Sequence, residues 1–122
     1  MTQITVEMPA LRHLRNVLER LKNMSPILTM SIDTNGVLAL KVDTDTAVVS
    51  VHFPNLTVLE CGAEDETVAA SVDIKKFHAF IAWDAVHPTS SRCNILRDRV
   101  ININLNLESY LQIKYYIPAV ES

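Results

Sequence analysis

The sequence predicts an α+β domain made of a duplicated βαβββ unit, with two helices side by side on one face of a continuous antiparallel sheet. One order of elements (an extended segment, an amphipathic helix and three alternating strands) occurs twice, over about residues 2–54 and 67–118. The copies close on Phe53-Pro54 and on Ile117-Pro118, sixty-four positions later. The strands after each helix are joined by turns too short for the crossovers of a parallel sheet, which excludes a doubly wound fold.

The first copy begins with a strand over residues 2–8, in which Ile4 and Val6 share one face. A helix is predicted over about residues 9–24, because apolar residues recur there at steps of three and four: Leu11, Leu14, Val17, Leu18 and Leu21. Pro9 suits the first turn of this helix, where a missing N–H leaves no bond unmade. Ser25-Pro26 ends it.

Three strands complete the first copy. The first two are joined at residues 33–36, whose Asn-Gly pair favours a hairpin, and the next turn is at residues 43–45. Their inward faces are predicted from strict alternation to be Leu28, Met30 and Ile32, then Leu38, Leu40 and Val42, then Ala47, Val49, Val51 and Phe53.

An acidic loop over residues 55–66 is predicted to join the copies. The second copy opens with a strand over residues 67–72, and Asp73 stands where a helix N-cap is expected. The helix is predicted to run to about Val86, before Pro88, with Ile74, Phe77, Phe80 and Ile81 facing inward. Strands follow over about residues 91–96, 99–106 and 109–117, in which apolar residues alternate with polar ones.

Composition indicates one globular, intracellular domain. The chain has 122 residues, of which 48% are apolar and 20% charged, enough for a single core. We find no secretory leader and no run long enough to span a membrane, so no membrane partner is expected. Cys61 and Cys93 fit no metal or disulfide pattern and are expected to be free thiols.

No motif for catalysis or cofactor binding is evident. Neither glycine (Gly36 and Gly62) lies between a strand and a helix, so no phosphate-binding loop is predicted. The histidines, which are His13, His52, His78 and His87, lack the spacing of metal ligands, and no metal or cofactor is expected. The acidic run Glu64-Asp65-Glu66 is most simply a solvated loop.

The helices carry the strongest charge signal in a chain whose net charge is −3. With the leucine stripe turned inward, the first helix presents Arg12 and Arg20, with Arg15 at the flank, and the second presents Lys75, flanked by Lys76. One interpretation is a solvated face with an ordinary Arg15–Glu19 pair. The other is a face that meets phosphates without reading bases.

Many short segments are similar to one family. They include residues 4–11, residues 18–25, residues 36–42, Val51-His52-Phe53, residues 72–77, Asn94-Ile95 and residues 111–119. Together they resemble the C-terminal half of the hydroxyurea-sensitivity subunit of the heterotrimeric DNA-damage checkpoint clamp, a family related to proliferating cell nuclear antigen. The resemblance covers nearly the whole chain.

The resemblance implies a non-catalytic clamp domain. In that family, three subunits of two such domains each close a ring around double-stranded DNA, with helices lining the hole and sheets outside. The residues expected to face DNA are then Arg12, Arg15, Arg20, Lys75 and Lys76. Glu19 and Asp84 would temper that face, which suits a ring that slides and implies weak, salt-sensitive binding by this domain alone.

The resemblance also assigns the sheet edges. The strand at 46–53, with Ala47, Val48, Val49, Ser50 and Val51, would pair with a neighbouring clamp subunit, and the strand at 109–117 with the N-terminal domain of the same subunit. The chain would be half of a two-domain subunit. The isolated half is expected to self-associate. Implied partners are two other clamp subunits, DNA, a clamp loader and repair enzymes, in the nucleus and also the cytoplasm.

Two alternative functions remain open. The first is an enzyme whose active site forms across a dimer and uses His52, Asp43 or Asp45 at strand ends. The second is a protein-binding module that docks partners along an edge strand and does not touch DNA.

Overall fold

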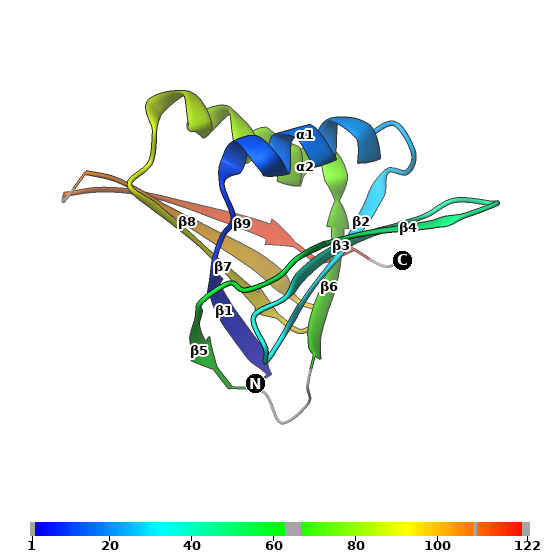
Figure 1. Cartoon of the computed structure of the whole chain (residues 1–122), viewed down its shortest axis with the longest axis horizontal. Helices are drawn as coiled ribbons and strands as arrows, with labels where there is room; N and C mark the ends of the chain where they lie inside the picture. The colour runs from blue at the N-terminus through cyan, green and yellow to red at the C-terminus, as the bar shows by residue number, and fades with distance from the viewer. Residues whose placement is uncertain (1, 63–66, 109, 121–122) are drawn as a thin grey trace.

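The computed structural model describes residues 2–62, 67–108 and 110–120 (Figure 1). The elements, in chain order, are β1 (Gln3–Glu7), α1 (Leu11–Leu21), β2 (Ile27–Asp33), β3 (Leu38–Asp43), β4 (Val48–Phe53), β5 (Val58–Cys61), β6 (Thr67–Asp73), α2 (Ile74–Ala79), the 3₁₀ helix η1 (Phe80–Val86), β7 (Ser90–Leu96), β8 (Val100–Glu108) and β9 (Leu111–Pro118). The predicted α+β class and the duplicated βαβββ order are confirmed.

The strands form two antiparallel sheets, so the prediction of one continuous sheet is wrong. One sheet has the order β5-β1-β7-β8-β9 and the other has the order β4-β3-β2-β6. The first strand of each copy pairs with the strands of the other copy, since β1 lies beside β7 and β6 lies beside β2. This exchange ties the two copies into one domain. Alternation shows which face of a strand is buried, but it does not show which strand is its neighbour.

A single apolar core joins both sheets and the helices. Ile4 and Val6 of β1, Leu28 and Met30 of β2, and Phe77 of α2 all belong to it and have no exposed surface. Both helices lie on the same side of the molecule, above the strands in the view of Figure 1. The two sheets are therefore walls of one core, and the helices close it.

Helix α1 follows its sequence pattern closely. Leu11, Leu14, Leu18 and Leu21 are buried, as the stripe predicts, and Val17 is half-buried. The helix is shorter than the predicted span of 9–24, because it begins at Leu11 and ends at Leu21. Its N-cap residue is Ala10, which makes no side-chain hydrogen bond to the helix. Burial of the apolar stripe is therefore its main stabilisation.

The second helix changes type halfway. Asp73 caps α2 as predicted, accepting a hydrogen bond from the Lys75 backbone N–H at 2.9 Å. The α-helix ends at Ala79 and continues as the 3₁₀ helix η1, so the predicted single helix to Val86 is wrong in its second half. A three-residue repeat puts Phe80 and Trp83 on one side. Both contact Tyr115 of β9, the first through its ring and the second through its indole N–H.

The segment between the copies is more ordered than the predicted acidic loop. Residues 58–61 form β5, which pairs with β1 at the edge of the five-stranded sheet. The acidic run at residues 64–66 lies outside the described residues. Leu56 donates its backbone N–H to the Gly36 carbonyl oxygen at 2.9 Å, which fastens this segment to the β2–β3 turn.

Replacing Gly36 by alanine should destabilise the fold. Gly36 has a φ of 83°, and an added Cβ would lie 2.1 Å from the carbonyl oxygen of Leu56. Backbone strain and this clash should together lower the free energy of unfolding by about 1–3 kcal/mol. Urea denaturation measures this free energy of unfolding. Exposed Asn35, in the same turn, is the control: Asn35→Ala should change the free energy by less than about 0.5 kcal/mol, and equal effects of the two changes would contradict the account.

Candidate functional site

The outward face of the paired helices carries exposed cations. The leucine stripe turns one side of α1 into the core, which leaves Arg12 and Arg20 exposed. Burial of Ile74 and Phe77 does the same for Lys75 and Lys76 on α2. Within the described part of the chain, none of these four cations has an ion-pair partner. We call Arg12, Arg20, Lys75 and Lys76 the helix-face cations.

Arg15 differs from these four cations because it is paired. Its Nη2 lies 3.0 Å from Oδ2 of Asp84, which is on η1. The Arg15–Glu19 pair considered from the sequence does not form. Glu19 instead contacts Nζ of Lys22 at 2.9 Å and Nε2 of His78 at 2.8 Å. Two contacts thus join the first copy to the second across the helix face, and sequence separation hid both.

Glu19 remains ionised at neutral pH. Hydrogen bonds from Lys22 and then from His78 lower the pKa of its carboxyl below the usual 4.5. A lowered folded-state pKa means that the contribution of Glu19 to stability is present above the ordinary value and is lost as the pH falls through the folded-state value. At physiological pH, Glu19 therefore holds negative charge among the cations of this face, and it reduces their attraction for phosphates.

Strand β4 is an open edge of the four-stranded sheet. Its residues alternate between exposed and half-buried, and Val48 is 64% exposed. Val48, Val49, Ser50 and Val51 lie in this strand, whereas Ala47 lies in the turn before it. The half-buried side chains Val49 and Phe53 pack against the core. The strand thus packs on the core through one face, and its outer edge is left open.

Strand β9 is the corresponding edge of the five-stranded sheet. Ile117 is buried and Tyr115 is half-buried, whereas Leu111 and Tyr116 are exposed. Exposed apolar residues on an edge strand are typical of a strand that pairs with another chain or domain.

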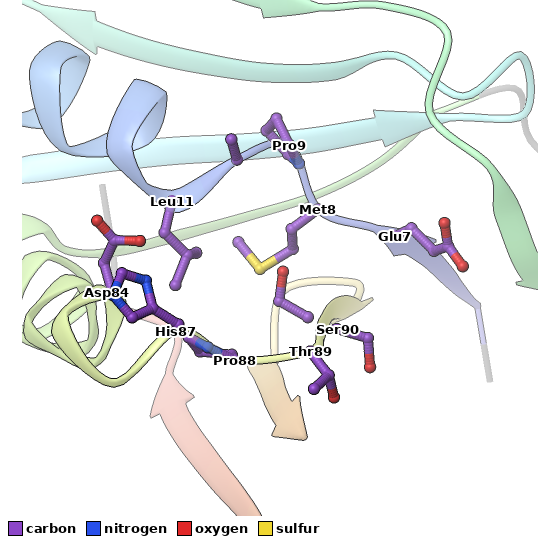
Figure 2. A pocket seen from close by; sticks show the side chains of 11 residues that line it. Glu7, Met8, Pro9, Leu11, Asp84, His87, Pro88, Thr89 and Ser90 are labelled. Carbon is purple, nitrogen blue, oxygen red and sulfur yellow. The ribbon is translucent and has the colours of Figure 1, made fainter. Parts of the chain in front are cut away.

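A hollow of about 460 Å³ lies between the end of η1 and the link from β1 to α1 (Figure 2). Met8, Leu11 and Pro88 give it an apolar lining, and Asp84 and His87 line the part contributed by η1 and the residue after it. The Asp84 carboxylate is already held by Arg15. We therefore assign no proton transfer to this hollow.

The residues of the enzyme hypothesis lie apart within one chain. Asp43 is opposite Val48, whereas His52 is opposite Ala39, so four strand positions separate them, about 13 Å. Within the described ranges, no three His, Cys, Asp or Glu side chains are grouped as metal ligands would be. No helix in those ranges is long and apolar enough to cross a membrane.

The two cysteines should react at very different rates. Cys61 is exposed in β5, whereas Cys93 is buried in β7, and burial raises the pKa of its thiol to about 12. Only the thiolate attacks an alkylating agent. Iodoacetamide at pH 8 should therefore modify Cys61 readily and Cys93 only after unfolding, as mass spectrometry of the digested protein would measure. Rapid modification of Cys93 in the folded Cys61→Ser variant would contradict the assigned burial.

Comparison with known proteins identifies the fold and the family. The sequence model described as Hus1-like protein matches residues 1–121. The human Checkpoint protein HUS1 is 30% identical over 125 residues, which cover 96% of this chain and 44% of that protein. The Drosophila melanogaster Checkpoint protein Hus1-like is 24% identical (98% and 43% covered), and the Dictyostelium discoideum Checkpoint protein hus1 homolog is 27% identical (96% and 44% covered).

A solved structure shares the fold. The PCNA of Thermococcus kodakaraensis superposes with a TM-score of 0.73 at 9% identity, covering 97% of this chain and 46% of that one. At this identity the likeness concerns the fold, which is that of a clamp domain. The chain spans slightly less than half the length of the curated relatives it matches. Because the family model matches residues 1–121 of its 122, the chain belongs to the Hus1-like protein family.

Proposed function

We propose that this chain is the C-terminal clamp domain of a ring-shaped DNA-damage checkpoint clamp and that it has no catalytic role. The observation that carries the proposal is the row of helix-face cations, exposed on the side of a clamp fold that the two helices cover. Such a face would attract phosphate oxygens at any DNA sequence, because charge attraction to the backbone does not depend on the base edges. The ring would encircle double-stranded DNA with this face lining the hole.

The arrangement of charge supports sliding rather than tight binding. Arg12, Arg20, Lys75 and Lys76 are exposed and would each meet a phosphate, whereas Arg15 is partly neutralised by Asp84 and Lys22 by Glu19. A few phosphate contacts give weak binding that falls steeply with salt. Topological closure of the ring would then hold it on DNA, which leaves the face free to move along the duplex.

The two sheet edges would close the ring. We assign β4, with the turn residue Ala47, to pairing with a neighbouring clamp subunit, and β9 to pairing with the N-terminal domain of the same subunit. Main-chain hydrogen bonds along an edge give affinity without a deep pocket. The proposed partners of the whole subunit are two other clamp subunits, a clamp loader and repair enzymes. The subunit would act in the nucleus as a scaffold for checkpoint signalling. It would also occur in the cytoplasm.

The isolated 122-residue chain should self-associate. Both β4 and β9 leave a row of backbone groups unpaired, and Val48, Leu111 and Tyr116 expose apolar surface beside them. Open edges of this kind pair with other strands as concentration rises. Sedimentation velocity should show an average mass that increases with loading concentration. A single monomer boundary at every concentration would contradict this expectation.

Topological retention on DNA tests the proposed function. The assembled clamp that contains this chain is loaded onto a nicked circular duplex and washed at high salt. Retention on the circle, followed by release when a restriction enzyme linearises it, is the expected result. Release from both forms alike, or equal retention on both, would contradict encirclement.

A second candidate function is favoured by the exposed apolar residues of the edges alone. In that case the chain docks protein partners along β4 or β9 and makes no contact with DNA. Neutralising the helix-face cations separates the candidates, because it would leave edge docking unchanged and would lower the affinity for duplex DNA.

A further inference from the structure

The outer face of the five-stranded sheet carries rows of amide side chains. Across the strands, Thr5 is opposite Asn94, Asn94 is opposite Asn102, and Asn102 is opposite Tyr116. In the next row Asn104 lies between Arg92 and Lys114. The neighbours of these asparagines along β8 are Ile101, Ile103 and Leu105, which are buried in the core. The amides therefore lie on the face turned away from the helices.

Hydrogen bonds fix the centre of this face. Asn94 is only 9% exposed, and its Nδ2 donates to Oγ1 of Thr5 at 2.7 Å and to Oε1 of Gln3 at 3.1 Å. Its Oδ1 accepts from Nδ2 of Asn102 at 3.3 Å, which sets the orientation of the second amide. Oδ1 of Asn102 is buried and, within the described residues, has no hydrogen-bond partner. A buried polar atom usually has a hydrogen-bond partner, so Oδ1 of Asn102 can still accept one.

Two hollows lie over these rows. One of about 460 Å³ extends from Gln3 and Glu60 to Lys114, and one of about 200 Å³ continues from there to Asn106. Arg92, Asn104 and Lys114 line both, so the hollows are adjacent parts of one groove. Neither Arg92 nor Lys114 forms an ion pair with any described residue. We call this hollow, lined by Arg92, Asn94, Asn102, Asn104 and Lys114, the amide groove.

We propose that the amide groove binds an extended acidic peptide segment of a partner protein. Asparagine side chains donate and accept as peptide groups do, so they can satisfy an extended backbone. An acidic side chain would lie between Arg92 and Lys114, while Glu60 at the far end disfavours a second one there. Three strand spacings separate Thr5 from Tyr116, about 14 Å, which about four extended residues span.

A nucleic acid is the less suitable occupant of this groove. Its affinity would come from many phosphate contacts, and the groove offers only Arg92 and Lys114 for them. The helix-face cations lie on the other side of the sheet, so a peptide in the groove and DNA at the helices would not compete. Peptide binding in the groove is therefore expected whether or not the ring encircles DNA.

Side-chain amide signals in NMR test the proposal directly. The 122-residue chain is titrated with a synthetic peptide that has an Asp-Glu-Asp centre and, separately, with the same peptide carrying Asn-Gln-Asn. We expect the Asn102 and Asn104 signals to shift with the acidic peptide only. The Arg92→Glu/Lys114→Glu variant should bind it about ten-fold more weakly or worse, whereas the matched Arg12→Glu/Arg20→Glu variant should bind it as before.

Three results would overturn the inference. The first is the absence of Asn102 and Asn104 shifts at millimolar peptide. The second is binding that survives Arg92→Glu/Lys114→Glu, and the third is an equal response to the neutral peptide. A duplex oligonucleotide serves as a further probe: if it moves the same signals and competes with the acidic peptide, the groove takes nucleic acid and the peptide assignment is wrong. Failure of DNA retention by the ring would leave all these readouts unaffected.

Discussion

Glutamate at all four helix-face cations is expected to weaken strongly the binding of linear duplex DNA by the assembled clamp at physiological salt. Each removed cation takes away one potential phosphate partner, and each new carboxylate repels the duplex. The slope of log affinity against log salt should flatten by about one for each cation removed. Affinity for duplex DNA should fall by roughly a hundred-fold or more. Fluorescence anisotropy with a labelled duplex, repeated at several salt concentrations, measures both quantities.

Two controls make this result specific to the helix face. The first control is Arg92→Glu/Lys114→Glu, which reverses two charges on the opposite face. It should leave DNA affinity nearly unchanged. Arg15→Gln should have a smaller effect than Arg12→Gln, because Arg15 is already paired with Asp84. If circular dichroism shows that the fourfold variant is folded and its DNA binding is unchanged, the helix face does not contact DNA.

Proline at Ser50 is expected to prevent assembly of the ring while leaving the domain folded. The Thr44 backbone N–H donates to the Ala47 carbonyl oxygen, and Val42 is opposite Val49. Because hydrogen-bonded pairs alternate along an antiparallel ladder, Val49 donates its N–H to β3 and Ser50 directs its N–H outward. Proline at Ser50 removes an outward donor and places its ring against an incoming strand. Co-purification with the neighbouring clamp subunit should drop by at least about ten-fold.

Substitutions at the same and the adjacent position provide the matched comparison. Ser50→Ala keeps the backbone N–H and should assemble normally, because strand pairing uses the main chain and the Ser50 side chain is exposed. Val49→Pro removes a donor to β3 and should lower the melting temperature, which Ser50→Pro should change little. Normal assembly of Ser50→Pro would mean that β4 is not the strand that pairs with the neighbour.

Local patterns in the sequence predicted the elements well, because each depends on residues close together in the chain. The leucines of α1 and the isoleucines of β8 are buried where alternation and helical spacing put them, and Asp73 caps α2. The same reasoning placed Arg12, Arg20, Lys75 and Lys76 on exposed positions. Their contact with DNA remains a prediction.

Contacts between the two copies could not be predicted from local patterns. The exchange of β1 and β6 between the sheets depends on how the helices lead the chain across the core, and no periodicity records this. Arg15 and Asp84 are 69 positions apart, and Glu19 and His78 are 59 apart, so a search within one helix paired Arg15 with Glu19 instead. In the 3₁₀ segment, Phe80 and Trp83 both contact Tyr115, which is distant in the sequence, so no local pattern predicts these contacts.

Site-specific photocrosslinking distinguishes a helix face that meets DNA, as proposed, from a sheet face that does. A photoreactive amino acid replaces Arg12 in one assembled clamp and Asn104 in another, and each is loaded onto a nicked circular duplex and irradiated. We expect crosslinks to DNA from position 12 at many places along the duplex and none from position 104. Crosslinks from position 104 with none from position 12 would contradict this proposal.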